Sequence, residues 1–156
     1  DVITALNAHG YGLAWFEQLG ADAPSRDDDL RVGDRRFRRH LLMGDRDAEP
    51  QYGVCFSQPH ALDYADLDGD GLKDILVGKR MWAHGPTGDV EPQAPPVVYW
   101  FRHQRTAAGA ASFAPQLIDD HSGVGVQITA ADVNADGRLD VLTASKLGVF
   151  VFLNRP

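Results

Sequence analysis

The sequence has little of several features that would assign it to a particular class of protein. It has one cysteine, Cys55, so an internal disulfide is impossible. No apolar run approaches the length of a membrane span, so we expect no transmembrane segment. Lys and Arg number 15 against 22 Asp and Glu, and the only basic run lies within residues 35–39. Because phosphate recognition needs clustered Lys and Arg, we expect no nucleic-acid partner.

Helical periodicity and the common catalytic motifs are also missing. The sequence contains no serine nucleophile elbow, no phosphate-binding glycine loop and no paired-cysteine motif. Short runs rich in Val, Ile, Phe, Tyr and Trp are instead bounded by Gly, Pro, Asn and Asp, which is typical of β-strands. With 44% hydrophobic residues the chain has enough apolar side chains for a core, and we predict an all-β fold.

An internal repeat organises these strands. Residues 1–5, 74–78 and 140–144 share one pattern, an Asp followed by apolar residues. In all three copies of the repeat a second apolar strand follows. In the first two copies a third strand comes next, and another strand then precedes the next acidic segment. These additional predicted strands are residues 13–17, 37–42, 60–65, 98–102, 113–118, 126–131 and 149–153. The repeat length of about 70 residues leaves room for four strands with long connections.

Four-stranded antiparallel units that recur bury their faces against each other, and their length favours blades of a β-propeller. We therefore predict a β-propeller segment of about two and a half four-stranded antiparallel blades. Residues 1–48 would form part of one blade, residues 58–120 a complete blade, and residues 124–156 part of another. About ten strands are too few for a closed ring, so we expect the rest of a larger propeller or other subunits as partners.

Two acidic loops repeat within this pattern. Residues 66–74 and 132–140 carry carboxylate or amide oxygens at positions one, three, five and nine, with Gly at position six. Oxygens on alternate residues around a turn, completed by the carbonyl at position seven, are what Ca²⁺ requires. The predicted ligands are Asp66, Asp68, Asp70, Leu72, Asp74, Asp132, Asn134, Asp136, Arg138 and Asp140. The alternative is an Asx-rich turn without metal.

The twelfth and ninth positions decide what kind of loop this is. Position twelve is Val77 in one loop and Thr143 in the other, where a helix–loop–helix calcium site has Glu. We therefore predict a strand–loop–strand site closed by the carboxylate at position nine. Asp1 aligns with Asp74 and Asp140, so we expect it to be the ninth position of a third loop.

These two nonapeptides and their flanking strands resemble the FG-GAP and VCBS repeat proteins over essentially the whole chain. The resemblance implies a calcium-stabilised propeller, usually extracellular or periplasmic, and often a module of a larger protein. Some bacterial members look like attachments to carbohydrate-active enzymes, and some polysaccharide lyases and lectins use similar propellers.

Because strand direction alternates, two kinds of connection lie opposite the acidic loops: those that join the second to the third strand of a blade, and those that join the fourth strand to the first strand of the next blade. Unusual polar and aromatic residues gather in these opposite connections, which is typical of a site for a polar ligand such as a sugar. The candidates are His9, Tyr11, His60, Lys79, Arg80, Trp82, His84 and Gln127. The alternative is that the histidines are ordinary turn residues, and three histidines also suit a transition metal if they converge.

Three functions follow from this pattern. The first is a non-catalytic module that binds a carbohydrate or protein ligand on the face opposite the calcium loops. The second is a carbohydrate-active enzyme of the lyase or hydrolase type, with His9, His60 or His84 as base and Lys79 or Arg80 neutralising a substrate carboxylate. The third is a structural subunit of a larger assembly, because an incomplete ring exposes strand edges.

Overall fold

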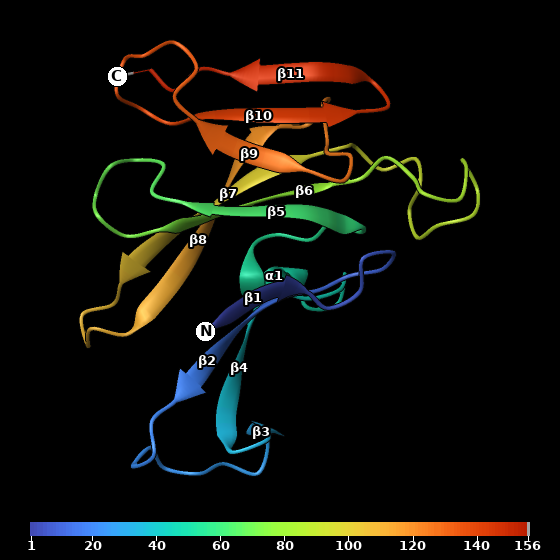
Figure 1. Cartoon of the computed structure of the whole chain (residues 1–156). Helices are drawn as coiled ribbons and strands as arrows, with labels where there is room; N and C mark the ends of the chain where they lie inside the picture. Colours follow the sequence, from blue (N-terminus) through green and yellow to red (C-terminus); the bar gives the residue numbers. More distant parts are fainter. Residues whose placement is uncertain (156) are drawn as a thin grey trace.

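The computed structural model describes residues 1–155 and contains three antiparallel sheets (Figure 1). The first sheet has the order β1-β2-β4-β3, the second β5-β6-β7-β8, and the third β11-β10-β9. Their bounds are β1 (Val2–Ala5), β2 (Leu13–Leu19), β3 (Leu30–Val32), β4 (Arg35–Met43), β5 (Pro59–Ala65), β6 (Asp74–Lys79), β7 (Val98–Arg105), β8 (Ala111–Asp119), β9 (Ile128–Ala131), β10 (Asp140–Ser145) and β11 (Gly148–Phe152).

The all-β fold class is confirmed, and the chain is a propeller-like segment. Each strand predicted from the sequence is present, and the sheets follow one another along the chain, with β5 contacting both β1 and β9. Two elements were not predicted, the short strand β3 and the one-turn helix α1 (Glu49–Tyr52). Residue 156, the last of the third predicted blade part, lies outside the described residues.

Strand β6 explains how the sheets are held together. It is buried along its whole length, and successive side chains point to opposite faces of the sheet. Ile75 and Val77 enter a core shared with the first sheet, whereas Leu76 enters a core shared with the third. Gly78 allows the close approach of the β8–β9 connection, because a Cβ there would lie 2.5 Å from Val124 Cγ1.

The two cores lie between neighbouring sheets, so each sheet covers the next. The first contains Leu13, Met43, Val54, Phe56, Ile75, Val77 and Phe101. The second contains Ala61, Leu67, Leu76, Val98, Val124, Ile128 and Val141. Burial of these side chains is the main source of stability in such a stack.

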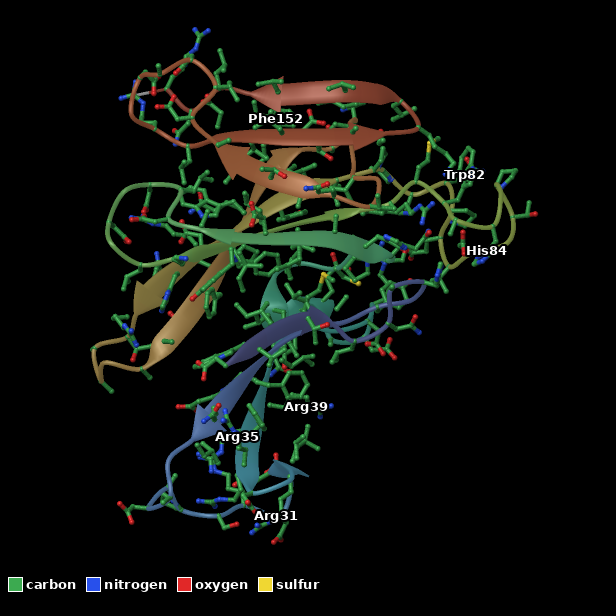
Figure 2. The ribbon with its side chains drawn as sticks, viewed as in Figure 1. Arg31, Arg35, Arg39, Trp82, His84 and Phe152 are labelled. Atoms are coloured by element: carbon green, nitrogen blue, oxygen red, sulfur yellow. The ribbon has the colours of Figure 1, made fainter. Side chains whose placement is uncertain are left out.

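The basic run within β4 has a structural role. Arg36 donates a hydrogen bond to the carbonyl of Ala23 at 2.8 Å, and Arg38 donates one to the carbonyl of Pro24 at 2.8 Å. Arg38 Nε also donates to Asp29 Oδ1 at 3.1 Å. These two arginines therefore hold the β2–β3 connection, while Arg35 and Arg39 are exposed (Figure 2).

Connections of the two kinds lie at opposite ends of the strands. Figure 1 shows the acidic loops 66–74 (green) and 132–140 (orange) on the left. The β1–β2 turn (blue) and the long β6–β7 loop, residues 80–97 (yellow-green), lie on the right. This arrangement separates the predicted calcium loops from the predicted ligand residues.

Candidate functional site

The first acidic loop joins β5 to β6 and folds around its own carboxylates. Asp66 Oδ1 accepts a hydrogen bond from the Asp70 N–H at 3.1 Å, and Asp66 Oδ2 accepts one from the Gly71 N–H at 2.9 Å. Asp70 Oδ1 accepts from the Leu72 N–H at 2.8 Å. Gly71 has a φ of 88°, a left-handed conformation that suits glycine. The chain therefore turns sharply and directs the side chains to its inside.

The second acidic loop, between β9 and β10, has the same hydrogen bonds at the same positions. Asp132 accepts from the Asp136 N–H at 3.1 Å and from the Gly137 N–H at 2.9 Å. Asp136 accepts from the Arg138 N–H at 2.9 Å. Gly137 has a φ of 87°. The two loops thus share a hydrogen-bonded shape although five of their nine residue types differ.

The aspartate at position nine ties the loop to the next strands. Asp74 accepts hydrogen bonds from the Leu67 N–H at 3.0 Å and the His103 N–H at 2.8 Å. Asp140 accepts from the Val133 N–H at 3.1 Å and the Asn154 N–H at 2.8 Å. Both carboxylates are fully buried. Burial raises the pKa of Asp74, and the N–H groups that it accepts from oppose this rise.

Asp1 has a related place in the first sheet. Its Oδ1 accepts a hydrogen bond from the Gln18 N–H on β2 at 2.9 Å, as Asp74 does from β7. Its Oδ2 accepts from Trp15 Nε1 at 2.9 Å. The shared bond to the neighbouring strand agrees with the alignment of Asp1 with position nine.

The donor set of both loops fits a hard cation. Asp66, Asp68 and Asp74 each offer an oxygen within 4.8 Å of the others. In the second loop Asn134 supplies an amide oxygen in place of Asp68, so the set still contains only oxygens. These are the donors that Ca²⁺ takes, and the carbonyls of Leu72 and Arg138 follow the glycines at the turn.

An arginine lies at each acidic loop. Arg102 Nε is 2.6 Å from Asp68 Oδ2, and Arg102 Nη2 is 4.0 Å from Asp70 Oδ2. Arg138 Nη2 is 3.2 Å from Asp136 Oδ2. Positive charge is therefore attracted to both loops, and a bound cation would compete with these guanidinium groups.

At the opposite end, the β1–β2 turn meets the β6–β7 loop at Asp89. Asp89 Oδ2 accepts hydrogen bonds from the Ala83 N–H at 2.6 Å and the His84 N–H at 2.8 Å. Asp89 Oδ1 lies 2.8 Å from His84 Nδ1 and 3.5 Å from His9 Nδ1. The Asp89 side chain is 1% exposed, whereas those of His9 and His84 are 46% and 66% exposed. The N–H and the imidazole of His84 lower the pKa of Asp89 well below its usual range.

His60 lies beside this cluster. Its ring centroid is 5.8 Å from that of His9, and its Nε2 is 3.1 Å from Arg80 Nη1. A guanidinium only donates, so His60 Nε2 accepts this hydrogen bond. Burial, and then the charge of Arg80, lower the pKa of His60, which favours its neutral form. Its buried Nδ1 has no hydrogen-bond partner within residues 1–155.

The other candidates have different surroundings. Lys79 is fully buried and donates to the carbonyls of Arg80 at 3.1 Å and Met81 at 3.4 Å. Burial lowers the pKa of Lys79. The Lys146 ammonium lies over the Trp82 ring, 5.9 Å from its centroid. Gln127 donates to Thr129 Oγ1 at 3.4 Å, outside the histidine cluster.

Tyr11 lies next to a residue that sequence reasoning did not single out. Burial and the neighbouring Glu91 carboxylate raise the pKa of Tyr11. Glu91 itself forms a bidentate pair with Arg46 at 2.8 and 2.7 Å. This pair connects the β6–β7 loop to the segment after β4.

The structure thus brings together His9, His60, His84 and Arg80, with Trp82 nearby on the same loop as His84 (Figure 2). Asp89, at the centre, was missed. The available signal was an Asp directly after a glycine in a long loop, a residue type that binds nearby backbone N–H groups.

The molecule therefore belongs to the all-β class, as a propeller-like segment with acidic loops at one end of its strands and a histidine cluster at the other. Comparisons with protein-family profiles, with curated proteins and with solved structures give no match to this chain. Among residues 1–155, no helix has the length and hydrophobicity needed to span a membrane.

Proposed function

We propose that this chain is a calcium-stabilised propeller module of the FG-GAP/VCBS repeat type, in which loops 66–74 and 132–140 each bind one Ca²⁺. The observation that carries the proposal is the recurrence of the same carboxylate-to-backbone hydrogen bonds in two loops of different sequence. Such bonds orient oxygens around one point, and a cation there relieves the repulsion among Asp66, Asp68 and Asp74.

Calcium would act on stability because it binds the folded loop and not the unfolded chain. At a free calcium concentration 100-fold above Kd, one site adds about 2.7 kcal/mol to the free energy of unfolding. For a chain of this size that raises Tm by about 5 °C or more per site.

The experiment is a calorimetric titration of the chelator-treated chain with CaCl₂, paired with thermal unfolding with and without calcium. We expect two sites and a higher Tm with calcium. Asp66→Ala and Asp132→Ala should each remove one site, and Asp28→Ala, on an exposed residue outside the loops, should remove none. A Tm that is the same with calcium and with chelator would contradict the proposal.

We further propose that the module is extracellular or periplasmic and binds a carbohydrate or protein ligand at the opposite end of the strands. The exposed imidazoles of His9 and His84, and the half-buried Trp82 on the same loop as His84, support this, since sugars stack on aromatic rings and bond to polar groups. The buried Lys79 would hold the loop and not contact the ligand.

A carbohydrate-active enzyme is the second candidate. The contact of His84 Nδ1 with Asp89 Oδ1 favours it, because a carboxylate that holds one imidazole nitrogen leaves Nε2 free as a base. Arg80 would then neutralise a substrate carboxylate.

One panel of neutral and uronic-acid oligosaccharides separates these two candidates. Binding is measured by calorimetry, and cleavage by new reducing ends or by the ultraviolet absorbance of an unsaturated uronate. Binding without cleavage, lost in Trp82→Ala but not in His121→Ala, is the result expected of a carbohydrate-binding module. Cleavage that is lost in His84→Ala would favour the enzyme.

The third part of the proposal is that this chain packs against further blades of a larger propeller or against other subunits. On the outer strand β11, Val149 is 80% exposed and Val151 is 48% exposed. Apolar side chains on an unpaired strand edge favour packing against further blades or subunits.

A further inference from the structure

Asp89, His9 and His84 form a cluster that the calcium proposal does not use. One atom from each of the three side chains lies within 4.8 Å of the other two. The cluster combines two segments far apart in the sequence, the β1–β2 turn and the β6–β7 loop, at the right of Figure 2. It also differs from the acidic loops in chemistry, because two of its three donors are imidazole nitrogens.

The carboxylate at its centre is fixed before any ligand arrives. The N–H groups of Ala83 and His84 both donate to Asp89 Oδ2, at 2.6 and 2.8 Å. Only Oδ1 faces the two imidazoles. A carboxylate that ligates a metal through one oxygen while backbone donors hold the other is the outer-shell arrangement common at metal sites.

The distances fit a small tetrahedral ion. Metal–ligand bonds of about 2.0–2.2 Å at Zn²⁺ place neighbouring ligand atoms roughly 3.3 Å apart. Asp89 Oδ1 is 2.8 Å from His84 Nδ1 and 3.5 Å from His9 Nδ1, so small side-chain movements bring both to this spacing. The two exposed rings, with centroids 4.8 Å apart, are free to make such movements.

We propose that His9, His84 and Asp89 bind one divalent transition-metal ion, with Zn²⁺ the best match. Two imidazoles and a carboxylate are ligands that suit Zn²⁺ and do not suit Ca²⁺. Each imidazole would ligate through Nδ1, so a proton on that nitrogen moves to Nε2 if the ring is neutral, and is released to solvent if the ring is protonated.

His60 completes the surroundings without ligating. Its Nε2 accepts from Arg80, and His60 is not among the three residues whose donor atoms lie within 4.8 Å of one another, so the proposed site has three protein ligands and leaves a fourth coordination position. A water molecule, or an oxygen of a bound ligand, would take that position. The proposal requires neither calcium binding nor carbohydrate binding.

The test is a calorimetric titration of the chelator-treated full chain with ZnCl₂ in the presence of excess CaCl₂, which fills the acidic loops first. We expect one equivalent of Zn²⁺ with micromolar or tighter affinity. Visible absorption of Co²⁺ in the same site should show the intense bands of a four-coordinate ion.

The variants locate the metal. His84→Ala and Asp89→Asn should each weaken Zn²⁺ binding by at least about 10-fold. His84 is 66% exposed, so its truncation leaves the fold intact, and near-ultraviolet circular dichroism checks this for both variants. His121→Ala is the matched control, because His121 pairs with Asp120 in a separate cluster with Asp119.

Three results would overturn the proposal. One is the absence of Zn²⁺ binding to the unmodified chain. Another is binding that His84→Ala and His9→Ala leave unchanged. The third is loss of binding in His121→Ala, which would assign the metal to residues 119–121.

Discussion

The two acidic loops have the same internal hydrogen bonds in unequal surroundings. Loop 66–74 lies in a four-stranded sheet between two neighbouring sheets, and the hydrogen bonds from Leu67 and His103 to Asp74 are buried. Loop 132–140 lies in the three-stranded sheet, and the bonds from Val133 and Asn154 to Asp140 are only partly buried. The shape of such a loop is therefore set by its own carboxylates and glycine, whereas the surrounding sheet determines how much each bond contributes to stability.

The largest expected difference between the loops is in the free energy of unfolding that is lost when the aspartate at position nine is replaced. Asp74→Ala removes the acceptor of two buried N–H groups and should lower the free energy of unfolding by about 3 kcal/mol. In Asp140→Ala, water reaches the N–H groups of Val133 and Asn154 more easily, because these bonds are only partly buried. This change should lower the free energy of unfolding by about 2 kcal/mol or less. Urea unfolding in the presence of chelator measures both without a contribution from calcium.

The control for this pair is Asp28→Ala, an exposed residue whose loss should change the free energy of unfolding by less than about 0.5 kcal/mol. If Asp140→Ala destabilises the chain more than Asp74→Ala, the burial of the hydrogen bonds does not determine how much each aspartate contributes to stability.

The next largest expected difference is in calcium affinity, and it depends on the residue at position three. Asp68 in the first loop corresponds to Asn134 in the second, so the second loop carries one carboxylate fewer. Calcium affinity follows the number of charged ligands, and Asn134→Asp should strengthen binding at the second loop by about 10-fold. Asp68→Asn should weaken the first loop by a similar factor.

Calorimetric titration of the two single variants and the double exchange measures this effect. The exchange should reverse the order of the two affinities. Affinities that do not respond to either change would mean that the third position does not ligate calcium.

The fold was largely predictable because strand periodicity and the repeat are local signals. The run of residues 74–78 identifies β6, and its unbroken burial between two sheets explains why it is apolar almost throughout. The strand β3 was not predictable, since Leu30 and Val32 are exposed and only three residues pair with β4.

The ligand face was only partly predictable. The turn residues His9 and His84 were found by their type and equivalent positions, and they do meet. Asp89 was missed because nothing in its spacing marks it, and its role depends on how a long loop folds back onto Ala83 and His84. The burial of Lys79 was also unexpected, since Lys is rarely fully buried and the strand pattern does not show which way its end points.

The smallest expected difference concerns position four, where the two loops have the same backbone conformation and different residues. Gly69 has a φ of 74° and Ala135 a φ of 60°. For a residue with a Cβ this left-handed conformation costs roughly 1–2 kcal/mol, and glycine avoids that cost but gains entropy in the unfolded chain. The net effect favours glycine by about 0.5–1 kcal/mol.

Ala135→Gly should therefore raise the free energy of unfolding by that amount, and Gly69→Ala should lower it by a similar amount. No atom lies within 4 Å of the position that a Cβ on Gly69 would take, so the second change adds backbone strain without a clash. Urea unfolding in chelator measures both, and opposite shifts of similar size are the expected result. If both substitutions change the free energy of unfolding in the same direction, the left-handed conformation that the loops share does not make glycine the more stable residue in both of them.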